Sequence, residues 1–124
     1  MRVAGFGFRA GATTASLRSA LGKCGGGNSA GLTALATPED KADAAAVRVL
    51  AGELGVPIRA IPLALLGLQP TQTLSSAQPP RYGAGSVAEA SALAACGPGA
   101  QLRMARVVSD DGMATAAIAE GNQQ

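Results

Sequence analysis

The sequence contains no histidine and no tryptophan, and aromatic residues make up only 2% of its 124 residues. Without histidine, a Ser-His-Asp or Cys-His catalytic triad is excluded, and so are the usual histidine-containing zinc sites. The two cysteines, Cys24 and Cys96, are too few for a cysteine-only zinc site or a disulfide-dense scaffold. We therefore expect no metal and no cofactor, and a core built from alanine, valine, leucine and isoleucine.

The charges are few and dispersed. Ten basic against eight acidic side chains give a formal net charge of +2, and neither a basic stripe nor stacking aromatics is present, so we expect no nucleic-acid partner. The longest apolar run, around Ala60 to Leu68, is too short for a membrane span. Arg9 interrupts the apolar stretch that a signal peptide would need. These features predict a cytoplasmic domain with reduced thiols and no membrane partner.

Alternating strand and helix patterns predict a single α/β domain over residues 1–124. Apolar runs typical of strands cover residues 2–8, 31–36, 57–63, 102–108 and 113–119. Helical patterns begin at Thr13 or Thr14, after Thr37-Pro38 and at Ser86, and glycines end each of them. We expect a three-layer α/β/α sandwich with a mixed, mostly parallel sheet of about five strands and a C-terminal antiparallel hairpin.

Two of these helix starts carry charged residues. Thr37 is predicted to cap a helix with Pro38 at its first position, and Lys41 then lies where the helix dipole disfavours a cation. Ser86 and Glu89 have the spacing of a capping box. For Lys41 and Glu89, a solvated lysine and a capping glutamate are the structural alternatives to a role in ligand binding.

The strongest local feature is the glycine-rich sequence Gly5-Phe6-Gly7-Phe8-Arg9-Ala10-Gly11, which follows a strand and precedes a helix. Its third glycine is one residue late for a dinucleotide fingerprint, the acid expected about 20 residues later is missing, and the Gly-Lys-Ser/Thr of a P-loop is absent. Such a turn still exposes backbone N–H groups at a helix N-terminus, and Arg9 adds a forked cation. We interpret the segment as an anion site. The alternative is that the glycines only allow a tight turn and that Arg9 pairs with a surface acid.

In an open parallel sheet, the loops after the carboxyl ends of the strands form the ligand-binding edge. The side chains expected to converge at this edge are Arg9, Thr13, Thr14, Lys41 and Ser86.

The remaining polar and reactive side chains receive local explanations. Cys24 and Cys96 are predicted near helix C-terminal ends, where the dipole raises a thiol pKa, so neither is a candidate nucleophile. Asp110 and Asp111 lie in the predicted hairpin turn, and turn chemistry accounts for both.

Several motifs follow one another over nearly the whole chain: Gly5-x-Gly7-x-Arg9-x-Gly11 with Thr13/Thr14, Lys41-Ala42-Asp43, Gly85-Ser86-Val87-Ala88-Glu89-Ala90 and Thr115-Ala116-Ala117-Ile118-Ala119. In this order they resemble the C-terminal domain family shared by CobE and CbiG of cobalamin (vitamin B12) biosynthesis. Family members often continue Lys-Ala-Asp with Glu-Pro-Gly, whereas this chain has Ala44-Ala45-Ala46. The length resembles the stand-alone CobE type more than the fused CbiG type.

The resemblance implies a role in corrin synthesis, with a corrin or precorrin intermediate as ligand. Such intermediates carry peripheral carboxylates, which suit an edge with Arg9 and Lys41. The predicted ligand-binding residues are Gly5, Gly7, Arg9, Gly11, Thr13, Thr14, Lys41, Gly85, Ser86 and Glu89. One alternative is a hydrolase that opens a precorrin lactone with release of acetaldehyde, with Lys41 and Glu89 as the candidate catalytic residues. The other is a non-catalytic module that interacts with another cobalamin-pathway enzyme.

Overall fold

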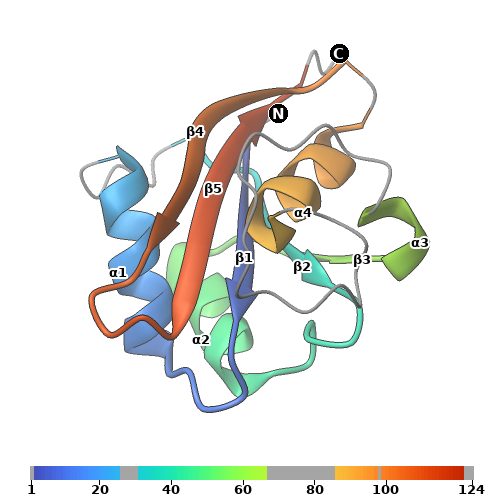
Figure 1. Cartoon of the computed structure of the whole chain (residues 1–124). Coiled ribbons are helices and arrows are strands. Elements are labelled where there is room, and N and C mark those ends of the chain that lie inside the picture. Colours follow the sequence, from blue (N-terminus) through green and yellow to red (C-terminus); the bar gives the residue numbers. More distant parts are fainter. Residues whose placement is uncertain (1, 26–30, 67–85, 98, 122–124) are drawn as a thin grey trace.

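The computed structural model describes residues 2–25, 31–66, 86–97 and 99–121, and Figure 1 shows how the elements are arranged. The strands are β1 (Arg2–Phe8), β2 (Ala34–Pro38), β3 (Ile58–Ile61), β4 (Gln101–Val108) and β5 (Ala114–Glu120). The helices are α1 (Thr14–Gly25), α2 (Ala45–Leu54), α3 (Leu63–Leu66) and α4 (Val87–Cys96). Within these ranges, no helix is long and apolar enough to cross a membrane.

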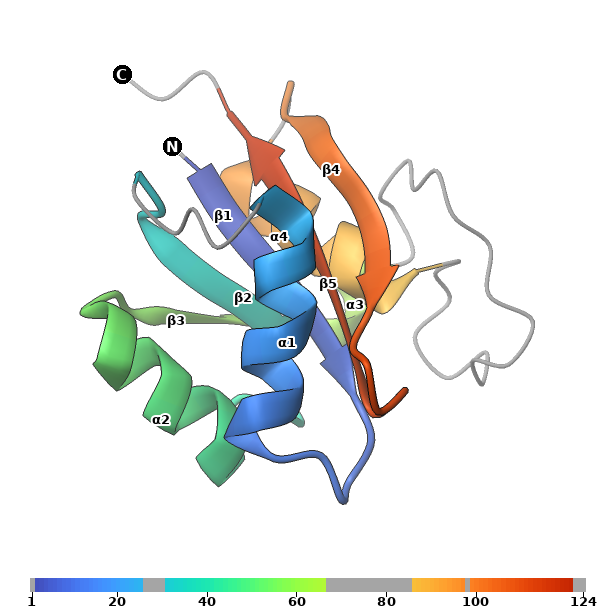
Figure 2. The same cartoon turned by 90° about the vertical axis from the view of Figure 1, so that its left-hand side faces the viewer.

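Five strands form one sheet in the order β3-β2-β1-β5-β4. β1 pairs in parallel with β2, and β2 in parallel with β3, whereas β5 is antiparallel to both of its neighbours, β1 and β4. Four strands therefore run in one direction and β5 runs in the other. Helices α1 and α2 cover one face of the sheet and α4 covers the other (Figures 1 and 2). The predicted three-layer sandwich with a mixed sheet and a C-terminal hairpin is confirmed.

The central strand β1 sends its side chains alternately to the two faces of the sheet. Ala4 and Phe6 are buried in the core on the side of α1 and α2, where Leu17 joins them. Val3 packs on the opposite face with Val87 of α4. Small aliphatic residues fill most of both layers, as the composition predicts, so the helices lie close to the sheet.

Helix α4 comes closest to the sheet at Gly5, which is buried in the middle of β1. A Cβ atom on Gly5 would lie 2.1 Å from the carbonyl oxygen of Ala88 and 2.6 Å from the backbone nitrogen of Ala92. Both distances are far below van der Waals contact, so only glycine fits between the strand and the helix backbone. Gly5 therefore fixes how deeply α4 sits on β1.

The second strand corrects the sequence-based prediction. β2 covers Ala34–Pro38 instead of residues 31–36, so Thr37 and Pro38 end a strand and do not begin a helix. Thr37 pairs with β3, and its buried Oγ1 donates a hydrogen bond of 3.0 Å to the carbonyl oxygen of Phe6. The next helix, α2, begins only at Ala45.

Pro38 is tolerated in β2 because of its place in the hydrogen-bond ladder. The backbone N–H groups of Leu35 and Glu39 donate to the carbonyl oxygens of Pro57 and Ile61, on the β3 side of the strand. Because successive residues of a strand point their backbone N–H groups to opposite sides, the backbone nitrogen of Pro38 points toward β1. The pairing with β1 ends at Ala36, and the N–H that proline lacks has no ladder bond to make there.

Candidate functional site

Three segments meet at the edge of the sheet where β1 and β2 end. The two strands are parallel, so their carboxyl ends, Phe8 and Pro38, lie at the same edge. Helix α4 begins beside the end of β1: a Cβ atom added to Gly7 would lie 3.4 Å from the Cβ of Val87, the first residue of α4. We call this region the carboxyl edge and define it as residues 8–13, 39–44 and 86. The carboxyl ends of β1 and β2 and the start of α4 therefore lie at one edge of the sheet.

Lys41 reaches across this edge to β1. Its Nζ lies 5.4 Å from the centroid of the Phe8 ring, within the range of a cation–π interaction. Its backbone N–H donates a hydrogen bond of 2.9 Å to the carbonyl oxygen of Pro38, which forms the turn after β2. Because α2 begins at Ala45, the prediction that Lys41 lies in the first turn of a helix is wrong, and its placement does not oppose a helix dipole.

Arg9 is exposed at the beginning of the loop between β1 and α1. Its backbone is held, because its N–H donates a hydrogen bond of 3.0 Å to the carbonyl oxygen of Met113. Its guanidinium makes no ion pair with any carboxylate in the described ranges. The alternative that Arg9 pairs with a surface acid therefore finds no support in this part of the chain.

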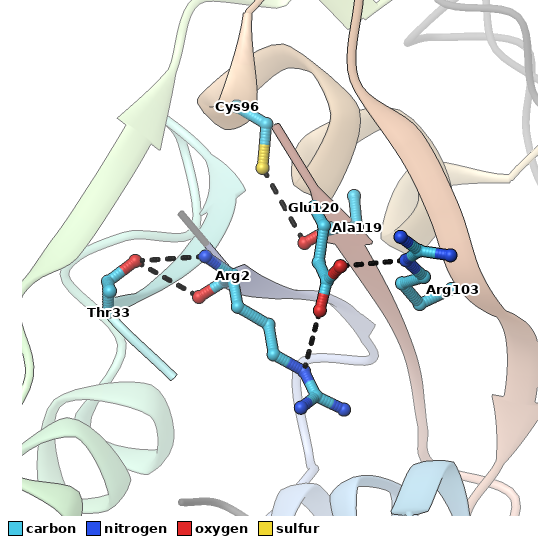
Figure 3. Close-up of polar contacts among 6 residues, drawn as sticks. All are labelled: Arg2, Thr33, Cys96, Arg103, Ala119 and Glu120. Carbon is cyan, nitrogen blue, oxygen red and sulfur yellow. Dashed lines mark hydrogen bonds and ion pairs between the residues drawn. The ribbon is translucent and has the colours of Figure 1, made fainter. Parts of the chain in front are cut away.

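At the opposite edge of the sheet, in contrast, the arginines share a carboxylate. Figure 3 shows Glu120 between Arg2 and Arg103, with Nε–oxygen distances of 3.7 and 2.7 Å. The backbone N–H of Arg2 also contacts the hydroxyl of Thr33 at 3.3 Å. One carboxylate thus serves two arginines at this edge, whereas Arg9 makes no ion pair with any carboxylate in the described ranges.

The carboxyl edge also carries acids, all on the loop after β2. Glu39 is occupied, because its Oε2 accepts a hydrogen bond of 3.1 Å from the backbone N–H of Leu63. Asp40 and Asp43 are exposed on either side of Lys41. An anion at this edge would meet Arg9 on one loop and a lysine flanked by carboxylates on the other.

The predicted glycines are in three different environments. Gly5 and Gly7 lie inside β1, so they are not part of a loop, and Gly7 accepts a hydrogen bond of 3.2 Å from Thr115 Oγ1. Gly11 is exposed in the loop before α1, and an added Cβ would lie 3.2 Å from Cε of Met113. Gly85 lies outside the described residues, as does the whole 67–85 segment.

The threonines at the start of α1 serve the helix. Thr13 and Ser16 cap each other, because each backbone N–H donates to the hydroxyl of the other residue, at 3.2 and 3.3 Å. Thr14 Oγ1 donates a hydrogen bond of 3.1 Å to the carbonyl oxygen of Ala46 in α2. Thr13 therefore lies in the carboxyl edge and Thr14 directly follows it, and both hydroxyls have partners within the fold.

Ser86 is the N-cap of α4, and its Oγ accepts a hydrogen bond of 3.2 Å from the backbone N–H of Glu89. Glu89 itself is fully buried, and its Oε2 accepts a hydrogen bond of 2.8 Å from the backbone N–H of Arg106. This N–H is available because β4 has an irregular register between Met104 and Val107, where two residues face one on β5. The Ser86 hydroxyl and the Glu89 N–H thus form one half of the predicted capping box, and the Glu89 carboxylate links α4 to β4.

Asp111 has a role that the turn pattern did not predict. Its Oδ2 accepts a hydrogen bond of 2.5 Å from Ser16 Oγ on α1, and its Oδ1 accepts one of 2.6 Å from Ser109 Oγ. These hydrogen bonds, with a third from the backbone N–H of Met113, lower the pKa of Asp111 to about 2. The prediction that turn chemistry accounts for Asp110 and Asp111 is therefore incomplete.

Both thiols have raised pKa values. Burial raises the pKa of Cys24 to about 11, and burial is also the main cause that raises the pKa of Cys96. The predicted direction is right, but the principal cause is burial and not the helix dipole. Among the described residues, no three histidine, cysteine, aspartate or glutamate side chains are grouped as a metal site requires.

Comparisons with known proteins agree on one pathway. A family model described as Cobalamin synthesis G C-terminus matches residues 2–119. The solved structure of CobE, a protein from the cobalamin (vitamin B12) biosynthetic pathway, is 33% identical, and the match covers 96% of this chain and 89% of that chain with a TM-score of 0.83. The cobalamin biosynthesis protein chiG from Agrobacterium tumefaciens str. C58 is 30% identical, with 99% of this chain and 100% of that chain covered and a TM-score of 0.73.

A more distant structure shares the fold. A cobalamin biosynthesis protein G homolog from Sulfolobus solfataricus is 19% identical, and the match covers 95% of this chain but 36% of that chain, with a TM-score of 0.68. No curated protein sequence matches the chain.

Proposed function

This chain belongs to the CobE/CbiG C-terminal family of cobalamin biosynthesis, and from that membership we propose that it binds a polycarboxylate corrin or precorrin intermediate at the carboxyl edge. The ligand of this proposal carries acetate and propionate groups around its rim, so the protein must offer cations that are not already neutralised. The carboxyl edge offers Arg9, which makes no ion pair with a carboxylate in the described ranges.

Arg9 is the observation that carries the proposal. It is exposed and makes no ion pair with a carboxylate in the described ranges, whereas Arg2 and Arg103 share Glu120 and Arg18 is bound by Glu53. Three other arginines also have no ion pair in these ranges, but they belong to α2, β3 and β4 and not to the carboxyl edge: Arg48, Arg59 and Arg106. A guanidinium can bind a carboxylate through two parallel hydrogen bonds. Its neighbouring loop backbone is anchored to Met113, so a ligand would not have to order the start of that loop.

Lys41 contributes a second cation, with a different environment. The Phe8 ring beneath its ammonium restricts the side chain to the carboxyl edge. Asp40 and Asp43 flank it in sequence and oppose a polyanion. We therefore expect Lys41 to contribute less to binding than Arg9, and we expect removal of the Asp43 charge to strengthen binding.

Spectrophotometric titration with hydrogenobyrinic acid tests the proposal, because binding changes the environment of the chromophore. Arg9→Ala should weaken binding by about fivefold, the effect of one exposed ion pair, and Asp43→Asn should tighten it. Arg59→Ala is the matched control, because it removes a positive charge from β3 instead of from the carboxyl edge. Burial raises the pKa of the Cys96 thiol, near the opposite edge, and Arg59 is close enough to Cys96 to lower that pKa in part. This variant should leave the affinity unchanged.

A corrinoid whose peripheral carboxylates have been converted to amides is the matched control ligand. It keeps the macrocycle but loses the anions, so it should bind more weakly and with less dependence on salt. Equal binding of both ligands, or equal affinity of wild type and Arg9→Ala, would contradict the proposal. Catalytic release of acetaldehyde from a precorrin lactone would show that the protein does more than bind.

A further inference from the structure

The turn between β4 and β5 is attached to helix α1 by its two aspartates, which contact different parts of the helix. Asp111 accepts its hydrogen bond from Ser16 in the first turn of α1. Asp110 contacts residues further along the helix: its Oδ1 lies 2.8 Å from Lys23 Nζ, and its backbone N–H donates to Ser19 Oγ at 3.0 Å. The two neighbouring acids therefore hold different parts of the same helix.

The Asp111 carboxylate is connected to both ends of the loop that carries Arg9, residues 9–13. At the end of the loop it accepts from Ser16, which is the mutual capping partner of Thr13. At the start of the loop it accepts a hydrogen bond of 3.0 Å from the N–H of Met113, and the carbonyl oxygen of Met113 in turn accepts from the Arg9 N–H at 3.0 Å.

The side chain of Met113 also packs against this loop. Cε of Met113 approaches Gly11 so closely that a Cβ there would lie 3.2 Å away. Within the loop, the N–H of Ala12 donates to the carbonyl oxygen of Arg9 at 3.0 Å. The Asp111 carboxylate, in the turn between β4 and β5, is thus connected by hydrogen bonds to a loop that lies more than ninety residues earlier in the chain.

We propose that Asp111 is a positioning residue for Arg9: it fixes the 9–13 loop at both ends, so that the Arg9 guanidinium is held at the carboxyl edge. The proposal rests on the proposed function in one respect, that Arg9 contacts the anionic ligand. Asp111 itself acts through Met113 and Ser16 and does not contact the ligand.

Whether removal of Asp111 weakens or strengthens the binding of the polycarboxylate shows whether Asp111 positions Arg9 or only repels the ligand by its charge. An acid near an anion site repels the ligand, so removal of its charge alone should leave binding of a polycarboxylate equal or tighter. Loss of positioning should weaken binding, because the ligand must then order the loop. Asp111→Ala removes both the charge and the hydrogen bonds, and we expect about threefold weaker binding of hydrogenobyrinic acid.

Asp111→Asn separates the two contributions. Its amide oxygen can accept from Ser109 and Met113, and its amide NH₂ can donate to Ser16 Oγ, so the geometry is kept while the charge is lost. We expect this variant to bind at least as tightly as wild type. Asp110→Ala, which loses a neighbouring charge without touching the loop, should behave in the same way.

A first experiment needs no ligand. Amide hydrogen exchange of the 9–13 loop, followed by NMR in the folded protein, should accelerate about tenfold at Arg9 and Ala12 in Asp111→Ala. Asp110→Ala and Asp111→Asn should change it by less than about twofold. Unchanged exchange in Asp111→Ala would overturn the proposal, whatever the protein binds.

A second experiment titrates the same variants and adds the double variant Arg9→Ala/Asp111→Ala. If Asp111 acts through Arg9, its removal has no further effect once Arg9 is gone. Equal or tighter binding by Asp111→Ala than by Asp111→Asn, or additive losses in the double variant, would overturn the proposal. If wild type binds no corrinoid, the proposed function fails, and the exchange experiment still decides whether Asp111 holds the loop.

Discussion

Replacement of Gly5 by alanine tests the close approach of α4 to β1, which places Ser86 at the carboxyl edge. The added Cβ would lie 2.1 Å from the carbonyl oxygen of Ala88 and 2.6 Å from the nitrogen of Ala92. Both are backbone atoms, so no side-chain rotation relieves the clash. A carbon–oxygen contact needs somewhat more than 3 Å, and α4 therefore has to move away from β1 by roughly 1 Å.

This displacement weakens the packing of the buried apolar residues of α4, which are Val87, Ala88, Ala90, Ala92 and Leu93. A gap of about 0.5–1 Å removes about a quarter to a half of the dispersion energy of a contact. Burial of a valine or leucine side chain contributes about 2 kcal/mol, and that of an alanine about 1 kcal/mol. We expect Gly5→Ala to lower the free energy of unfolding by about 2–4 kcal/mol, and Tm by about 8–16 °C.

Thermal unfolding followed by circular dichroism measures the effect. The matched control is Gly22→Ala in α1, where the added Cβ meets nothing within 4 Å and should stabilise the helix by about 0.5–1 kcal/mol. Adding Ala92→Gly to Gly5→Ala should not restore stability, because the clash involves the helix backbone. A Tm for Gly5→Ala within about 2 °C of wild type, or full recovery in the double variant, would refute the reasoning.

Three further predictions concern single side chains. Ser91 is fully buried and its Oγ has no hydrogen-bond partner among the described residues, so Ser91→Ala should raise the free energy of unfolding by about 1 kcal/mol in urea titrations. The Asp111 pKa is lowered to about 2, so the stabilisation that Asp111 provides is complete above about pH 4 and is lost toward pH 2. The difference in Tm between wild type and Asp111→Ala should therefore shrink over that interval and stay constant above it. Cys24, whose pKa is about 11, should resist alkylation by iodoacetamide at pH 8 until the protein unfolds, as mass spectrometry would show.

Elements whose pattern is unambiguous within a short window could be predicted from the sequence. β1 was predicted with its observed bounds, and Ser86 was correctly identified as the cap of α4. Thr37-Pro38 was misassigned because a threonine before a proline is equally suited to a helix start and to the last residues of a strand. The pairing of β2 with β3 decides between them, and that pairing is not visible in the local sequence.

In the candidate site, too, local sequence patterns were predictable and contacts between distant segments were not. The sequence singles out Arg9 as a candidate because a cation after a glycine-rich strand end has a local chemical meaning, whereas the contact of Asp111 with Ser16 joins residues far apart in the chain. The Ser-Asp-Asp-Gly turn predicts a hairpin but not the helix beside it. Likewise, Glu89 was expected to cap its own helix, and its hydrogen bond to the Arg106 N–H depends on an irregularity in β4.

The pairing of β1 with β5 has a consequence for how the chain is made. Arg2 pairs with Glu120, so the centre of the sheet joins the first described strand to the last one (Figure 1). After the ribosome has produced β2 and before it has produced β5, β1 can pair with β2 on one side, but it has an unpaired row of N–H and C=O groups on the other. We expect the nascent chain to expose this row until synthesis reaches β5, so that β1 is open to pairing with other extended segments during that interval.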